Sequence, residues 1–177
     1  MSNYETSFTI EVKPVEASQV DLVHRQFSQD DYSLPQHRRY QVQSNGEGVY
    51  LIAWDRETPI GGFLVRWSGP QDEAVSSRID ISRSAFLEAG LTIDEYRRKG
   101  VATAIIREAE RLAKLHGCTH IGMEVSSNDN PDANRLYKKL GYVDWGYGDF
   151  TISWKCMDAD GNSRVDSDVV TFLQKPL

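Results

Sequence analysis

A basic turn that contains glycine joins an expected strand to a long expected helix at residues 96–106, with the sequence YRRKGVATAII. The first N–H groups of a helix have no partner within it, and they carry the positive end of the helix dipole. Gly100 allows close approach of the backbone to an anion. Arg97, Arg98 and Lys99 add positive charge in a chain whose formal net charge is -6. The turn is therefore predicted to hold a phosphate group.

Composition restricts the class of protein. A chain of 177 residues with 40% hydrophobic and 26% charged residues is typical of a folded protein, and we expect one domain over residues 1–177. Its pI near 5.2 argues against general binding to nucleic acid or to anionic membranes. The N-terminus lacks the pattern of a signal peptide, and the apolar runs are too short to span a bilayer. We expect a cytoplasmic protein.

The hydrophobic pattern predicts strands that alternate irregularly with helices. The expected strands cover residues 8–12, 48–54, 59–67, 85–93, 121–125, 150–154 and 169–173. The expected helices cover residues 17–27, 101–116 and 131–140. Because the regular βαβ rhythm is missing, the predicted fold is α/β (α+β), with a mixed, mostly antiparallel central sheet flanked by helices.

Two segments carry further expectations. Residues 28–46 are polar and contain Pro35, so we interpret them as irregular or partly helical, and either a lid over a substrate or a solvated connector. Gly90, inside an expected strand, indicates a bulge that would separate this strand from its neighbour.

The helix after the basic turn is amphipathic. Its apolar residues recur at helical spacing and are expected to pack on the sheet, namely Val101, Ile105, Ala109, Leu112 and Leu115. Glu110 and Lys114 are expected to pair on its solvated side. Gly117 is expected to end the helix.

The two cysteines, Cys118 and Cys156, are too few for a disulfide framework and are expected to be reduced thiols. His116, Cys118 and His120 have a spacing that could suggest a metal site. However, they fall where a helix ends and a strand begins, which favours a structural role, and no metal is expected.

Two motifs in succession resemble a known family. Arg97-x-x-Gly100-x-Ala102 is followed, after a helix and a strand, by a second motif that runs from Asn130 through Ala133, Leu136 and Tyr137 to Gly141 and Tyr142. Together they resemble the acetyl-CoA motifs of the GCN5-related N-acetyltransferases (GNAT). The resemblance is strong over residues 87–142, although Asp94 and Glu95 stand where many members have a proline before the acidic and aromatic residues.

The resemblance implies an acyl-CoA N-acyltransferase fold that uses acetyl-CoA as its co-substrate. It implies that the turn holds the CoA pyrophosphate through Arg97, Arg98, Lys99, Gly100, Val101, Ala102 and Thr103. It also implies that backbone groups near Leu91, Thr92 and Ile93 pair with the pantetheine arm, with Asn130 beside that arm.

In such a family Tyr137 would lie near the thioester sulfur, where its hydroxyl could protonate the departing thiolate. A phenol with a pKa of about 10 stays protonated at neutral pH, which suits this role. The alternative is that Tyr137 only fills the core. The expected bases for the acceptor amine are Glu88 and Glu124, each with the alternative of a structural or solvated glutamate. Since neither cysteine has a histidine beside it, we expect direct attack in a ternary complex.

The acceptor is an amine whose identity stays open, as does the length of the acyl chain. Its binding residues are sought in the segment 32–40 and among Trp145, Tyr147, Asp149, Phe150 and Trp154, which could equally be core residues.

The sequence therefore predicts an N-acetyltransferase with no nucleic-acid or membrane partner, and a homodimer is one assembly that stays open. A non-catalytic acyl-CoA-binding sensor or interaction module of the same fold is the alternative. An ATP-binding P-loop is disfavoured because the turn lacks Gly-Lys-Ser/Thr.

Overall fold

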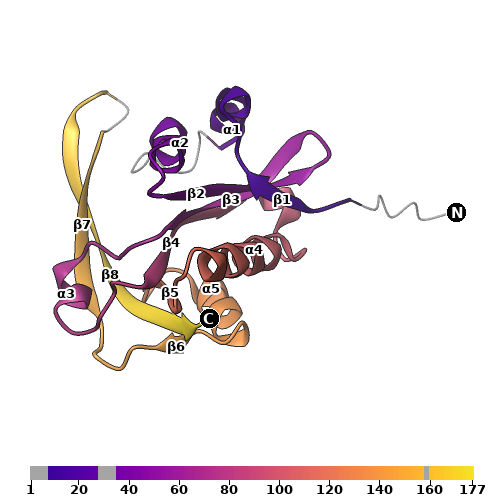
Figure 1. Ribbon diagram of the computed structural model, residues 1–177. Helices are drawn as coiled ribbons and strands as arrows, with labels where there is room; N and C mark the ends of the chain where they lie inside the picture. Colours follow the sequence, from indigo (N-terminus) through magenta and orange to yellow (C-terminus); the bar gives the residue numbers. More distant parts are fainter. Residues whose placement is uncertain (1–7, 28–34, 158–159) are drawn as a thin grey trace, which may run out of the picture.

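The computed structural model describes residues 8–27, 35–157 and 160–177, and an eight-stranded sheet forms its centre (Figure 1). The strands lie in the order β1-β2-β3-β4-β5-β8-β6, and β7 pairs with β8. All neighbours pair antiparallel except β4 and β5, which are parallel. The strands are β1 (Glu11–Pro14), β2 (Gly48–Asp55), β3 (Thr58–Arg66), β4 (Ser84–Thr92), β5 (His120–Ser126), β6 (Val143–Asp144), β7 (Phe150–Met157) and β8 (Ser163–Pro176).

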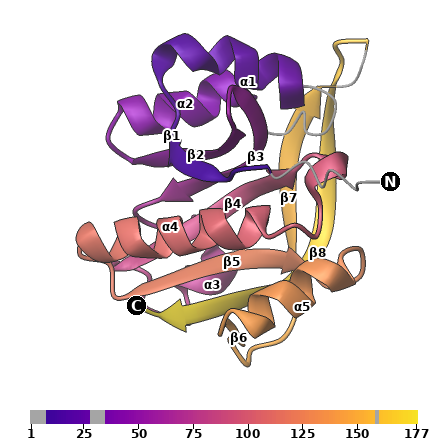
Figure 2. The ribbon, with the colours of Figure 1, turned by 90° about the vertical axis from the view of Figure 1, so that its right-hand side faces the viewer.

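Helices cover both faces of the sheet. They are α1 (Val20–Phe27), α2 (Gln36–Ser44), α3 (Glu73–Ser76), α4 (Val101–Leu115) and α5 (Pro131–Lys139), with 3-10 turns η1 (Ala17–Gln19) and η2 (Asp94–Tyr96). In Figures 1 and 2, α1 and α2 lie on one side of β2 and β3, while α4 lies on the other. None of the helices within the described ranges is long and apolar enough to cross a membrane.

Each face has its own apolar core. The α4 core joins the sheet to α4, with α5 packed at its edge through Leu136, Tyr137 and Leu140. The α1–α2 core joins the other face of β2 and β3 to these two helices. Since side chains alternate along a strand, neighbouring residues of β4 and β5 belong to opposite faces.

The mixed α/β class with a mostly antiparallel sheet is confirmed. The expected strands and helices all occur, with shifted ends. The segment expected to be irregular or partly helical contains a nine-residue helix, α2, while its residues 28–34 lie outside the described part of the chain. β6 and the short helix α3 were not predicted, because two and four residues are too few to show a hydrophobic period.

The predicted contacts of α4 need two corrections. Leu115 is 72% exposed, whereas Ile106 and Ala113 are fully buried. Leu115 points away because successive helix residues are rotated by about 100°, which takes it off the buried stripe. Glu110 does not depend on Lys114 for a partner: Lys175 on β8 donates to it at 2.9 Å, and the Tyr142 hydroxyl donates at 3.0 Å. The neighbouring strand supplies partners that are closer to this face of the helix than the next turn.

Candidate active site

The basic turn begins α4 as the sequence predicts. Gly100 has φ +85°, a left-handed conformation that favours glycine, and no side chain caps the helix. The first N–H groups of α4 therefore stay available to an anion. Arg98 is also left-handed, with φ +59°, so the turn contains a strained non-glycine residue, a feature that clusters at functional sites.

The three basic residues of the turn differ in their surroundings. Arg97 pairs with Asp94 at 3.0 Å, and its guanidinium also donates to the Thr92 carbonyl at 3.4 Å. The Lys99 ammonium lies 5.4 Å from the centre of the Tyr96 ring and 5.5 Å from that of Phe8. Arg97 and Arg98 line the groove described next, whereas Lys99 is held against aromatic rings beside it.

A groove of about 800 Å³ runs from this turn along β4 to α5. Of the residues predicted to bind the cofactor, Ile93 and Lys99 do not line it. Those that do are Leu91, Thr92, Arg97, Arg98, Gly100, Val101, Ala102, Thr103, Asn130 and Tyr137. The Ile93 N–H is already used, because it donates to the Ile60 carbonyl at 3.1 Å. The sequence analysis missed Phe63, which reaches the groove from β3.

β4 separates from β5 where the groove meets the sheet. Their parallel pairing covers only Ser84 to Leu87 of β4. Beyond it, the register with β3 moves from Leu64 opposite Glu88 to Gly62 opposite Leu91, so β4 carries a bulge at residues 89–90. This bulge agrees with the prediction from Gly90. The edge of β4 that faces β5 is therefore free of strand pairing beside the groove.

A smaller pocket of about 190 Å³ opens between the separated strands. It contains all three predicted catalytic residues, Tyr137, Glu88 and Glu124. Ala133 and Tyr137 of α5 and Gly90 line both the pocket and the groove, so the two cavities adjoin. The sequence analysis also missed Ser126, which lines the pocket and donates to Asp168 of β8 at 3.3 Å.

Asn130 and Tyr137 are positioned by α5. The Asn130 side chain caps this helix by accepting from the Ala133 N–H at 3.1 Å, and Pro131 occupies the first turn. About two turns after Asn130, Tyr137 packs edge-on against Tyr142, with ring centres 6.3 Å apart. Burial raises the pKa of Tyr137 to about 12, so its hydroxyl stays a proton donor across the neutral range.

The two glutamates are in different electrostatic states. Glu88 forms an ion pair with Arg66 of β3 at 2.5 Å. Glu124 has a buried carboxylate oxygen, Oε1, with no hydrogen-bond partner among the described residues. Burial raises the pKa of Glu124 to about 7, and the negative charges of Asp72 and Glu88 add to this effect. Glu124 can therefore accept a proton near neutral pH, whereas Glu88 is held by an arginine.

The residues proposed for the acceptor are mostly placed elsewhere. Trp145 is 6% exposed and belongs to a small core with Phe150 at its edge, which agrees with the alternative that it is a core residue. Tyr147 and Asp149 are exposed, and Trp154 lies on the β7–β8 hairpin. None of these five residues lines either cavity. Of the segment 32–40, residues 32–34 lie outside the described part.

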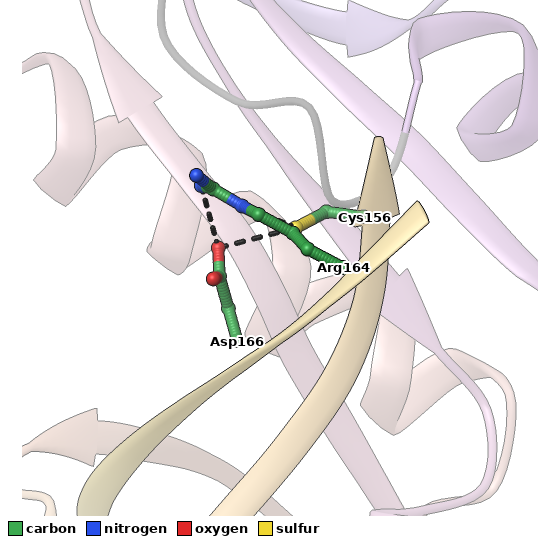
Figure 3. A network of polar contacts seen from close by, with 3 residues as sticks. All are labelled: Cys156, Arg164 and Asp166. Atoms are coloured by element: carbon green, nitrogen blue, oxygen red, sulfur yellow. Dashed lines mark hydrogen bonds and ion pairs between the residues drawn. The ribbon is translucent and has the colours of Figure 1, made fainter. Parts of the chain in front are cut away.

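Both cysteines are held in structural contacts. Cys156 lies in a polar network near the tip of the hairpin (Figure 3), where its thiol donates to Asp166 at 3.1 Å and accepts from Arg164 Nε at 3.2 Å. Cys118 belongs to the α4 core, and burial raises the pKa of its thiol. Neither lines the pocket or the groove, so neither is placed as an acyl-carrying nucleophile.

The histidines near Cys118 have contacts of their own. His116 stacks on Trp67 with ring centres 4.4 Å apart, and His120 bonds to the Thr119 hydroxyl at 3.0 Å. Within the described ranges, no group of three or more His, Cys, Asp or Glu side chains could hold a metal ion.

Comparisons with known proteins agree with this geometry. The model of the acetyltransferase (GNAT) family matches residues 17–142. The aminoglycoside N(6')-acetyltransferase type 1 of Acinetobacter baumannii is 34% identical over 58 residues, which are 33% of this chain and 39% of that protein. The chain thus spans about two fifths of the length of this curated relative.

Solved structures share the fold at low identity. NAA60 of Arabidopsis thaliana, in complex with a bisubstrate analogue, has 18% identity and a TM-score of 0.67 over 95% of this chain and 98% of its own. The PaiA N-acetyltransferase of Thermoplasma acidophilum, in complex with coenzyme A, has 16% identity and a TM-score of 0.62 over 96% of this chain and 99% of its own.

Proposed function

Since this chain belongs to the acetyltransferase (GNAT) family, we propose that it transfers the acetyl group of acetyl-CoA to a primary amine by direct attack in a ternary complex. The pocket between β4 and β5 is the observation that carries the proposal. It contains a phenol donor, Tyr137, and a carboxylate with a pKa of about 7, Glu124. The pocket adjoins the groove, which starts at the uncapped end of α4.

The groove would bind the CoA moiety. Its uncapped α4 start, with Arg97 and Arg98, suits the pyrophosphate, because helix N–H groups and guanidinium groups both stabilise phosphate oxygens. The unpaired edge of β4 would accept the pantetheine arm as an added strand does. Asn130 uses its side-chain oxygen to cap α5, so it supports this wall of the groove.

The chemistry divides between two residues. An alkyl ammonium has a pKa of about 10 and must lose a proton before it attacks. Glu124 would take that proton, and the amine nitrogen would then form the C–N bond as the C–S bond breaks. The leaving thiolate would receive a hydrogen bond from Tyr137. The second proton of the attacking nitrogen would then pass to this thiolate, so that the products are the amide and the CoA thiol. A phenol with a pKa of about 12 holds its proton more tightly than a thiol of pKa about 8.5, so Tyr137 stabilises the thiolate chiefly as a donor.

Binding is tested by calorimetry with acetyl-CoA and with ATP. We expect saturable binding of acetyl-CoA and none of ATP, because the turn lacks the P-loop lysine and hydroxyl. Absence of acetyl-CoA binding would refute both the enzyme and the non-catalytic sensor.

Turnover is tested by thiol release from acetyl-CoA with a panel of amines. The panel contains an aminoglycoside, because of the curated relative's name, a diamine, free lysine and a peptide with a free N-terminus. Release that depends on one of these amines supports the transferase. Binding of acetyl-CoA without release for any of them supports the sensor.

A further inference from the structure

Helix α2 has a polar inner face. Arg39 is 1% exposed and Gln36 is 2% exposed, whereas the adjacent Arg38 lies on the exposed side of the same helix. Within the described ranges, Arg39 is the only charged residue that is buried. A guanidinium is hardly ever buried completely unless partners compensate for the lost water. The contacts of Arg39 should therefore explain its position.

The contacts lead from α2 to the wall of the candidate active site. Arg39 Nη1 donates to the Ala89 carbonyl at 3.4 Å, across 50 residues of sequence. Its guanidinium also lies 5.8 Å from the centre of the Tyr50 ring. The Tyr50 hydroxyl donates to Gln36, which lies one turn before Arg39 on α2. The inner face of α2 thus places a cation against the bulge of β4.

Ala89 is an unusual acceptor for this contact. Its φ is +56°, in the left-handed region that is unfavourable for residues other than glycine. It sits in the bulge, where the ladder register changes, and it lines the smaller pocket together with Gly90. Such a conformation persists only when surrounding contacts enforce it.

We infer that Arg39 is a positioning residue for acyl transfer, which holds the Ala89–Gly90 peptide unit of the pocket wall through its hydrogen bond to the Ala89 carbonyl. The inference rests on the proposed function. The bond restrains a strained residue that lines the pocket. Arg39 itself does not line the pocket.

The test compares Arg39→Met with Arg107→Met, which replaces an exposed arginine of α4 that lines neither cavity. The measurements are the turnover number, the KM for acetyl-CoA, and amide hydrogen exchange over residues 87–92. Arg39→Met should lower the turnover number about tenfold, the usual effect of losing a charged hydrogen bond, with a smaller change in KM. Exchange at residues 89–91 should become faster. Arg39→Lys should keep part of the turnover, and Arg107→Met should behave as wild type.

A second pair of variants separates positioning from packing. Glycine adopts the left-handed conformation without strain, so the loss caused by Arg39→Met should shrink at least threefold in an Ala89→Gly background. Equal losses in both backgrounds, or wild-type exchange at residues 89–91 in Arg39→Met, would overturn the inference. If Arg39→Met does not fold, Arg39→Lys with and without Ala89→Gly gives the same comparison. If the wild-type protein shows no turnover, the proposed function fails, while the exchange experiment still decides whether Arg39 holds the bulge.

Discussion

Glu88 and Glu124 show how strongly surroundings alter one kind of side chain. Both line the pocket, but Glu88 forms an ion pair with Arg66, whereas Glu124 has a buried oxygen without a partner among the described residues and a pKa raised to about 7. A base must be ionised to accept a proton, so a residue with this pKa gains activity as the pH rises through neutrality. The two glutamates therefore should differ in the pH profile of the reaction.

We expect the turnover number of the wild type, at saturating substrates, to rise with pH through an apparent pKa near 7. Glu124→Gln should lose this acidic limb and most of the turnover, while Glu88→Gln should keep the limb, because the Glu88 carboxylate is already paired with Arg66.

The stability of the protein gives an independent check on Glu124. The pKa of Glu124 is higher in the folded protein than in the unfolded chain. Its ionisation therefore lowers the stability of the fold as the pH rises from the pKa of the unfolded state to about 7. Glu124→Gln should therefore gain thermal stability relative to wild type above pH 7. An unchanged acidic limb in Glu124→Gln would assign the proton to water.

Tyr137 is tested by removing only its hydroxyl. Tyr137→Phe should lower the turnover number by about a hundredfold or more, which is typical for the loss of a positioned acid, and should change the affinity for acetyl-CoA little. Tyr142→Phe is the matched control, because its hydroxyl bonds to Glu110 and it lines neither cavity. Steady-state kinetics and calorimetry make the comparison. Equal turnover in Tyr137→Phe and wild type would leave Tyr137 with a packing role only.

At the scale of elements, the bulge of β4 depends on close packing against β3. A Cβ on Gly90 would lie 2.3 Å from two atoms of the Phe63 ring, closer than carbon atoms approach in proteins. Both residues line the groove and the pocket. Glycine at position 90 therefore lets β3 and β4 shape the two cavities together.

Gly90→Ala should force the ring or the strand to move. We expect it to lower the free energy of unfolding by about 1–3 kcal/mol, the usual cost of overpacking, and to weaken binding of acetyl-CoA. Chemical denaturation and calorimetry measure these effects. Phe63→Leu in the Gly90→Ala background makes room for the methyl group and should restore part of the stability. Wild-type values in the single variant would mean that the bulge tolerates a side chain.

At the scale of the whole molecule, the sheet separates the two halves of the proposed reaction. Leu87 and Met123 face the α4 core, so Glu88 and Glu124, their neighbours in sequence, face the opposite side. The groove for the CoA moiety lies beside α4 and α5, on the first side. The pocket between β4 and β5 is lined by residues of both sides, so the donor and the acceptor amine would meet there from opposite faces.

The C-terminal strand ties these parts together. Lys175 of β8 and Tyr142, which follows α5, both bond to Glu110 in the middle of α4. Three segments that are distant in sequence thus meet at one carboxylate. These contacts join α4 to β8 and to the segment that follows α5.

The sequence by itself determined the local parts of the site. Gly100 at the start of α4, Asn130 and Pro131 at the start of α5, and Gly90 in a strand each report a backbone requirement of their own neighbourhood. Such signals act over a few residues, so they can be interpreted without the fold. The hydrophobic pattern predicted the mixed sheet, and the resemblance to the GNAT motifs implied most residues that line the groove.

The surroundings of the two glutamates and the contacts of α2 depend on the folded chain. Glu124 owes its raised pKa to burial and to Asp72 and Glu88, and Glu88 owes its pairing to Arg66, all on other segments. α2 was hard to predict because its inner face carries Gln36 and Arg39, which show no apolar period. In the folded chain, Gln36 meets the Tyr50 hydroxyl and Arg39 meets the Ala89 carbonyl. Desolvation and pairing depend on what surrounds a side chain in space, and the order of residues along the chain does not contain this information directly.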